Sequence, residues 1–120
     1  MAETQSLGRF GEEQAARYLR RRFYAILERN YRCRFGEIDL IAKKGGYLVF
    51  VEVKLRKDAS HGAAREFVDE RKQRKVIAAA EHYLSQHETA LQPRFDVIEV
   101  YAPKGEHGPV EIGHIENAFM

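Results

Sequence analysis

The sequence contains a single cysteine and lacks any long hydrophobic run. Cys33 is the only cysteine among 120 residues, which excludes a disulfide within the chain and a cysteine-based zinc knuckle. No segment approaches the ~20 apolar residues that a membrane-spanning helix requires. Residues 1–13 contain no apolar core of the kind found in signal peptides. We therefore expect a cytoplasmic protein that does not enter a membrane.

The overall composition is that of a globular protein. Hydrophobic residues make up 44% of the chain and charged residues 32%. A chain of this length can bury a core but is too short for two domains of ordinary size. We therefore expect one domain over residues 1–120.

The small net charge of +2 hides an uneven distribution along the chain. Residues 17–34 contain seven basic residues and one acid, whereas residues 81–120 contain seven acids and two basic residues. A basic face of this kind can contact phosphate groups. Solvated helix faces produce the same pattern about as often, so the charge alone does not decide between the two interpretations.

Hydrophobic periodicity predicts two helices among several strands. The first helix is expected from Leu7 to about Phe23, with Ser6 as its cap, and the second from Asp69 to about Gln86, with Asp69 as its cap. Strands are expected at residues 24–32, 37–43, 47–54 and 94–101, and residues 110–115 form either a short edge strand or an ordered tail. The order α-β-β-β-α-β predicts an α/β domain with a central mixed sheet flanked by helices.

Two of these strands carry charged residues where a buried strand should be apolar. Glu37 and Asp39 interrupt the second strand, and Glu52 and Lys54 interrupt the third. If Gly45-Gly46 forms a two-residue turn, counting back places Asp39 opposite Glu52 and Glu37 opposite Lys54. Carboxylates about 5 Å apart repel each other unless a divalent cation lies between them. A bulge or a longer loop would break this pairing.

A period of two assigns the remaining strand residues to faces. Asp39 and Ile41 should share one face of the second strand, and Ile38 and Leu40 the other. The third strand, residues 47–54, is apolar on both faces, so we expect it at the centre of the sheet.

Both helices direct polar residues towards the sheet. Glu12 precedes two alanines of the apolar stripe by three and four residues and should face the core side, whereas Glu13 should pair with surface arginines. In the second helix the apolar stripe extends back to Lys72 and Gln73. For Glu12 the alternative is a first-turn glutamate that the helix dipole favours. For Lys72 and Gln73 the alternative is an apolar stripe that ends in polar residues at the end of the helix.

These residue types suit phosphodiester hydrolysis. Magnesium prefers one or two carboxylates together with water and phosphate oxygens, which Asp39 and Glu52 could supply, with Glu12 reaching them from the helix. Lys54 shares a face with Glu52 and could orient a water molecule or stabilise negative charge. The backbone carbonyl of Val53 is a further candidate ligand. We expect Glu37 to balance the charge of Lys54.

The combination resembles the PD-(D/E)xK nuclease core of restriction endonucleases and archaeal-type Holliday junction resolvases. More closely, the chain resembles the YraN family of predicted endonuclease-like proteins. The matching segments cover most of the chain: GRFGEEQAARYL (8–19), NYRCRFGEIDLIA (30–42), LVFVEVKLR (48–56), ERKQRKVIAAAEHYL (70–84) and RFDVIEV (94–100).

This resemblance implies a restriction-endonuclease-like fold that uses Mg²⁺ or Mn²⁺. It implies metal and catalytic positions at Asp39, Glu52 and Lys54, with Glu12 as a helix-borne acid and Gln73 as an accessory polar residue. The chain departs from the nuclease pattern in two places. A leucine follows the lysine where a small polar residue is expected, and the proline of the motif's name is absent before the aspartate.

The leading hypothesis is a metal-dependent DNA endonuclease, with branched or damaged DNA among its candidate substrates. Resolvases of this fold are dimers, so a homodimer is a possible assembly. The competing hypotheses are a non-catalytic nucleic-acid-binding or adaptor protein and a structural domain with a buried ion network. His61 is more often a loop histidine than a general base. Phosphate contacts are expected from Arg20, Arg21, Arg22, Arg32, Arg34, Arg56 and Lys57.

Overall fold

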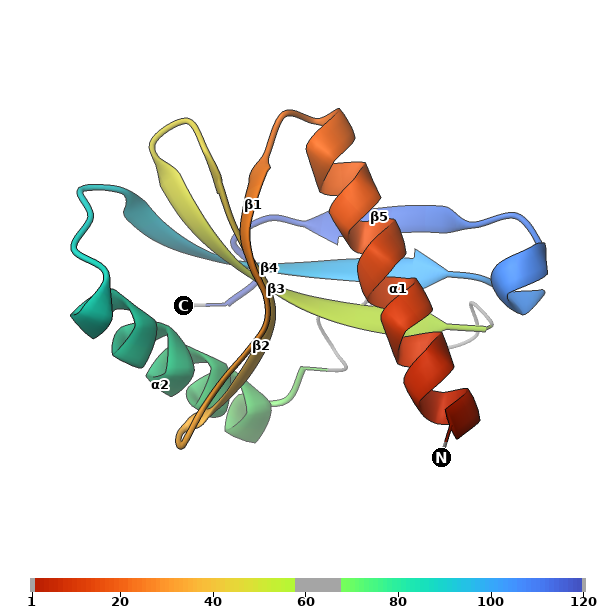
Figure 1. Cartoon of the computed structure of the whole chain (residues 1–120), viewed down its shortest axis with the longest axis horizontal. Coiled ribbons are helices and arrows are strands. Elements are labelled where there is room, and N and C mark those ends of the chain that lie inside the picture. The colour runs from red at the N-terminus through yellow and green to blue at the C-terminus, as the bar shows by residue number, and fades with distance from the viewer. Residues whose placement is uncertain (1, 58–67, 120) are drawn as a thin grey trace.

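The computed structural model of the chain describes residues 2–57 and 68–119, and it confirms the predicted α/β class and element order (Figure 1). Residues 110–115 contribute an edge strand rather than a tail. His61 lies outside the described residues. The elements are α1 (Ala2–Arg21), β1 (Ala25–Cys33), β2 (Gly36–Lys44), β3 (Tyr47–Arg56), α2 (Glu70–Gln86), β4 (Gln92–Tyr101), the short 3₁₀ helix η2 (Gly105–His107) and β5 (Glu111–Ile115).

The sheet has five strands in the order β1-β2-β3-β4-β5. Only β3 and β4 are parallel, and the other neighbouring pairs are antiparallel, so the sheet is mixed as predicted. Parallel neighbours need a crossover connection, and α2 lies in the segment that joins β3 to β4. The third strand is central, as its apolar character on both faces predicts.

Each helix covers one face of the sheet (Figure 1). Val49 and Val51 of β3 pack in the core on the α1 side, while Leu48 and Phe50 pack on the α2 side. This alternation is the predicted one. The fully buried positions on both faces explain why β3 reads as a continuous hydrophobic run.

The helix boundaries differ from the prediction at the N-terminal helix. α1 begins at Ala2, so Ser6 lies inside the helix and is not its cap, and α1 ends at Arg21. The predicted cap of α2 is confirmed, because the Asp69 side chain accepts a hydrogen bond from the backbone N–H of Lys72 at 2.8 Å. None of the helices in the described parts of the chain is long and apolar enough to cross a membrane.

The hairpin between β2 and β3 has the predicted two-residue turn. Lys44 pairs with Tyr47, and Gly45 adopts the left-handed φ of 58° that such a turn favours in glycine. The ladder then runs back as far as Leu40 opposite Val51 and ends there. The predicted ladder pairs of Asp39 with Glu52 and of Glu37 with Lys54 are therefore wrong.

Beyond Leu40, β2 leaves β3 and continues only with β1, which creates a fork in the sheet. The β1–β2 hairpin bends towards α2, and Figure 1 shows its tip beside that helix. Gly36 at the tip lies so close to α2 that a Cβ there would stand 3.1 Å from the carbonyl oxygen of Lys75. The bend also breaks the predicted alternation, because Ile38 packs with Ile41 on the α2 side and Leu40 packs on the α1 side.

Candidate functional site at the β2–β3 fork

Asp39 occupies the point where β2 separates from β3. Its Oδ2 atom accepts a hydrogen bond from the backbone N–H of Val53 at 2.8 Å, so the carboxylate replaces the ladder partner that β2 no longer supplies. Within a strand, the N–H and C=O of one residue point to the same side. The carbonyl of Val53 is therefore directed to the fork as well, which keeps it available as a ligand.

Glu52 lies next to Asp39 and is only 4% exposed. Its Oε1 atom is 3.8 Å from Nζ of Lys72, and no donor in the described part of the chain reaches the buried Oε2 atom. Burial, followed by the charge of Asp39, raises the pKa of Glu52 to about 9. An ionised Glu52 is thus unfavourable unless additional positive charge is close to it.

Lys72 and, with a smaller effect, Lys54 lower the pKa of Glu52 by their positive charges. Lys54 is partly buried on β3, on the same face as Glu52. The predicted accessory residue Gln73 donates a hydrogen bond from Nε2 to the carbonyl of Val68 at 2.8 Å, which fixes the chain just before α2. Sequence reasoning placed Lys72 towards the sheet but did not include it in the site.

Glu12 faces the same region from α1. Burial and then the charge of Asp39 raise its pKa, in spite of a hydrogen bond from Asn30 and the charge of Arg29. Glu12 lines a cavity of about 350 Å³ together with Arg9, Asn30 and Arg32. Among the described residues, no three His, Cys, Asp or Glu side chains lie close enough together to hold a metal ion.

The two remaining acids of the predicted motifs form surface pairs. Glu37 contacts Arg32 of the neighbouring strand, with 3.3 Å between Oε2 and Nε, and so it does not balance Lys54 as predicted. Glu13 is confirmed as a surface residue, but its partner is Arg29 of β1 at 2.8 Å. Neither acid is part of the fork.

The predicted phosphate-contacting residues fall in several places. Arg32 lines a cavity of about 340 Å³ with Lys72 and Lys75, between the hairpin and α2. The guanidinium of Arg34, two residues after Arg32, lies over the ring of Phe35. Arg56 is 10% exposed and forms an ion pair with Glu99, a placement that disfavours the predicted phosphate contact. The remaining predicted phosphate contacts are exposed but lie outside this region, and they are Lys57 at the end of β3 and Arg20, Arg21 and Arg22 of α1.

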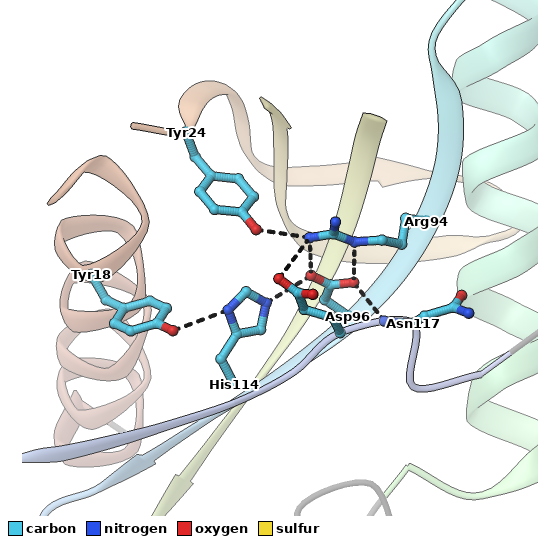
Figure 2. Close-up of polar contacts among 7 residues, drawn as sticks. Tyr18, Tyr24, Arg94, Asp96, His114 and Asn117 are labelled. Atoms are coloured by element: carbon cyan, nitrogen blue, oxygen red, sulfur yellow. Dashed lines mark hydrogen bonds and ion pairs between the residues drawn. The ribbon is translucent and has the colours of Figure 1, made fainter. Parts of the chain in front are cut away.

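A second polar cluster, which sequence reasoning missed, surrounds Asp96 of β4 (Figure 2). Asp96 is fully buried and accepts two hydrogen bonds from Arg94, one from Nε2 of His114 at 2.7 Å and one from the backbone N–H of Asn117. Burial alone would raise the pKa of Asp96, but the hydrogen bonds from His114 and Arg94 outweigh it, and the pKa is lowered.

One signal in the sequence could have identified this cluster. Asp96 alternates with the buried Phe95 and Val97 in a strand whose other positions on its own face, Ile98 and Val100, are apolar. That is the same signal that singled out Asp39 and Glu52. No comparable signal marks His114, because the short strand that carries it has little apolar alternation.

The comparisons with known proteins agree with the motif resemblance. The model of the family described as Uncharacterised protein family UPF0102, the YraN family, matches residues 11–100. A UPF0102 protein of Caldanaerobacter subterraneus subsp. tengcongensis is 44% identical over 115 residues, which is 95% of this chain and 94% of the relative. A UPF0102 protein of Syntrophotalea carbinolica is 48% identical over 95% of this chain and 91% of its own length.

The similarity extends over essentially the whole chain in other relatives. A UPF0102 protein of Christiangramia forsetii is 40% identical over 120 residues, covering 100% of this chain and 98% of the relative. The match therefore includes the fork, the helix that carries Glu12 and the strand that carries Asp96.

Proposed function

The chain belongs to the uncharacterised protein family UPF0102, and within that family we propose that it is a metal-dependent nuclease that hydrolyses phosphodiester bonds in DNA. The observation that carries the proposal is the buried Oε2 atom of Glu52, which no donor in the described residues reaches, beside the carboxylate of Asp39. Two adjacent carboxylates in a hydrophobic strand environment are costly when both are ionised, which is why Glu52 keeps its proton, with a pKa of about 9, when no additional cation is present. A divalent cation removes that cost.

The donor atoms at the fork suit Mg²⁺ or Mn²⁺. Asp39 and Glu52 would hold the ion with carboxylate oxygens, and the carbonyl of Val53 offers a further hard oxygen ligand. Glu12, whose pKa responds to Asp39, lies too far away to complete a three-acid ligand set and would act on the ion through a water molecule. The absence of sulfur and histidine donors from these residues fits a hard cation rather than zinc.

When bound, such an ion polarises the scissile phosphate and lowers the pKa of a water molecule. Lys54 shares the face of Glu52 and would stabilise the negative charge that develops on the phosphate oxygens. Lys72 holds the carboxylate of Glu52 from α2 and would limit its rotation. These roles make Lys54 the catalytic lysine and Lys72 a positioning residue.

The DNA backbone would approach along the basic cavity between the hairpin and α2. Arg32, Lys72 and Lys75 line this cavity, and Arg34 lies at the hairpin turn beside it. The cavity borders the fork because Lys72 contacts both. A strand held there by its phosphates would present a phosphodiester to Asp39 and Glu52.

The proposal is tested by a cleavage assay on linear, nicked and branched DNA with and without Mg²⁺ or Mn²⁺. Lys54→Ala and Asp39→Asn should each lower the rate by about 100-fold or more, the usual effect of removing a group that stabilises transition-state charge. Glu12→Gln and Glu13→Gln form a matched pair, of which only the first should lower the rate.

Two results would refute the assignment. Cleavage that persists undiminished in Lys54→Ala and Asp39→Asn would mean that the active groups lie elsewhere. Salt-dependent DNA binding without turnover on any substrate or metal would support a non-catalytic nucleic-acid-binding protein instead.

A further inference from the structure

A second basic cleft lies between α1 and β5. It has a volume of about 420 Å³, and we refer to it as the α1–β5 cleft. One helical stripe of α1 forms its wall, since the lining positions 14, 17, 18, 21 and 22 are spaced by three and four residues. Val110, just before β5, and Ile112, within it, supply the apolar side.

The wall of the α1–β5 cleft concentrates positive charge, and the charge of Glu13 acts on one of its arginines, Arg17, only at longer range. Arg17, Arg21 and Arg22 line it, and none of them has an acidic group within 4.0 Å in the described part of the chain. Arg17 and Arg21 are like charges one helical turn apart, an arrangement that destabilises a helix. The helix dipole favours cations in the last turn of α1, but that does not explain why three arginines line one cavity.

The Asp96 cluster holds part of this wall in place (Figure 2). Because ionised Asp96 can only accept hydrogen bonds, Nε2 of His114 carries a proton, and Nδ1 of the same ring is hydrogen-bonded to the Tyr18 hydroxyl at 3.2 Å. The guanidinium of Arg22 in turn lies over the Tyr18 ring, 4.5 Å from its centroid. A chain of contacts that starts at the buried Asp96 of β4 thus fixes two side chains that line the cleft, Tyr18 and Arg22.

We propose that the α1–β5 cleft binds a nucleotide, with its phosphate between Arg17, Arg21 and Arg22 and its base or sugar against Val110 and Ile112. Arginine forks match phosphate oxygens in a bidentate manner. The cleft volume lies in the range of small organic ligands, and inorganic phosphate would leave the apolar side of the cleft without a contact. The nucleotide is either free or part of a single strand.

This cleft is separate from the fork. It lies at the β5 edge of the sheet on the α1 side, whereas Glu52 faces α2 near the β1–β2 hairpin. The proposal therefore does not depend on the nuclease proposal. A double variant with Asp39→Asn and Glu52→Gln should keep nucleotide binding even if metal binding is lost.

The test measures binding of thymidine 5′-monophosphate and of a 5′-phosphorylated oligothymidine in EDTA, by NMR titration and fluorescence anisotropy. Arg20→Glu is the matched control for Arg21→Glu, because the two residues are adjacent and exposed and only Arg21 lines the cleft. Arg21→Glu should weaken binding at least tenfold, and Arg20→Glu by much less. Tighter binding of the oligonucleotide would identify a strand as the ligand, and tighter binding of the monophosphate a free nucleotide.

Three results would overturn the proposal. The first is no saturable binding of either probe, and the second is an equal loss in Arg20→Glu, which would indicate only a diffuse charge effect. The third is competition by inorganic phosphate as strong as that by the monophosphate, which would remove the role of Val110 and Ile112. Thermal unfolding of both variants verifies that these exposed substitutions leave the fold intact.

Discussion

At the residue scale, the carboxyl group of Glu52 is the least ordinary feature of the protein. It is buried, it lies beside a second carboxylate, and its only ion pair in the described residues is a 3.8 Å contact with Lys72. A group of this kind is retained at a cost in stability, which is typical of sites that bind a ligand or perform chemistry. The sequence identified it because a charged residue interrupts an otherwise apolar strand.

The stability of the metal-free protein should reveal this cost. The pKa of Glu52 is raised in the folded state to about 9. The stability that the protonated carboxyl group contributes is therefore fully present below the unfolded pKa of 4.5, and it is lost as the pH rises towards 9. Glu52→Gln should therefore stabilise the metal-free protein at pH 8 by about 1–3 kcal/mol relative to wild type, and by much less at pH 5.

Urea denaturation in EDTA at both pH values measures this difference. The comparison between variants cancels the titration of all other groups, provided that their environments do not change. A free-energy difference that is the same at pH 5 and pH 8 would show that Glu52 is ionised without penalty.

Asp96 shows the opposite behaviour at the residue scale. It is as buried as Glu52, but Arg94, His114 and the backbone of Asn117 satisfy both of its oxygens. Because the pKa of Asp96 is lowered in the folded state, the ionised carboxylate stabilises the fold above the unfolded pKa of 3.8. This stabilisation is lost as the pH falls through the folded pKa.

Asp96→Asn should destabilise the fold by about 3 kcal/mol at pH 7, because Arg94 then keeps a partly buried charge without its main counterion. Glu116→Gln is the matched control, since Glu116 is an exposed partner of the same arginine at 3.7 Å and should cost less than about 1 kcal/mol. Urea denaturation gives both values, and equal losses would contradict the assignment of Asp96 as the central acceptor.

At the element scale, the fork between β2 and β3 separates the strand pairing that the sequence predicts from the pairing that it does not predict. Strand identity, the two-residue turn and the register as far as Leu40 follow from periodicity and from Gly45-Gly46. The departure of β2 does not, because it depends on how the hairpin tip packs against α2. Asp39 still lies beside Glu52, but it is held there by accepting a hydrogen bond from the backbone N–H of Val53 rather than by ladder pairing.

The contact of Gly36 with α2 should control this geometry. Gly36 has a φ of 154°, and a Cβ there would stand 3.1 Å from the carbonyl oxygen of Lys75. Gly36→Ala should therefore cost about 1–3 kcal/mol through backbone strain and the close contact. Gly46→Ala is the matched control because a Cβ at that position meets nothing within 4 Å.

Urea denaturation gives the cost of each glycine substitution, and Mn²⁺ affinity reports on the fork. We expect Gly36→Ala to weaken both. A Gly36→Ala variant that is as stable as the Gly46→Ala variant would show that the hairpin tip does not depend on the contact with α2.

At the scale of the whole molecule, the basic residues that cluster in the sequence separate in space. Arg21 and Arg22 line the α1–β5 cleft, whereas Arg32 lines the cavity beside the fork. Periodicity could not show this division, since it depends on which sheet edge each segment lies against. The layered α/β arrangement itself was predictable, because helix and strand patterns alternate along the chain and β3 is apolar on both faces.

DNA binding should depend on the cavity beside the fork in a salt-dependent manner. Lys75 lines that cavity, while its neighbour Arg74 pairs with Glu70 on the outer surface of α2. Lys75→Gln should lower the slope of log affinity against log salt by about one, and Arg74→Gln should leave it unchanged. Fluorescence anisotropy in EDTA measures both slopes, and identical slopes would place the DNA elsewhere.

If Asp39 and Glu52 share a divalent cation, calorimetric titration with Mn²⁺ should detect it. We expect one saturable site in wild type that is lost in Asp39→Asn and Glu52→Gln and kept in Glu13→Gln. Because the pKa of Glu52 is about 9, binding at pH 7 should also release about one proton, seen as a dependence of the heat on the buffer. No saturable uptake, or uptake that both substitutions leave unchanged, would contradict the account.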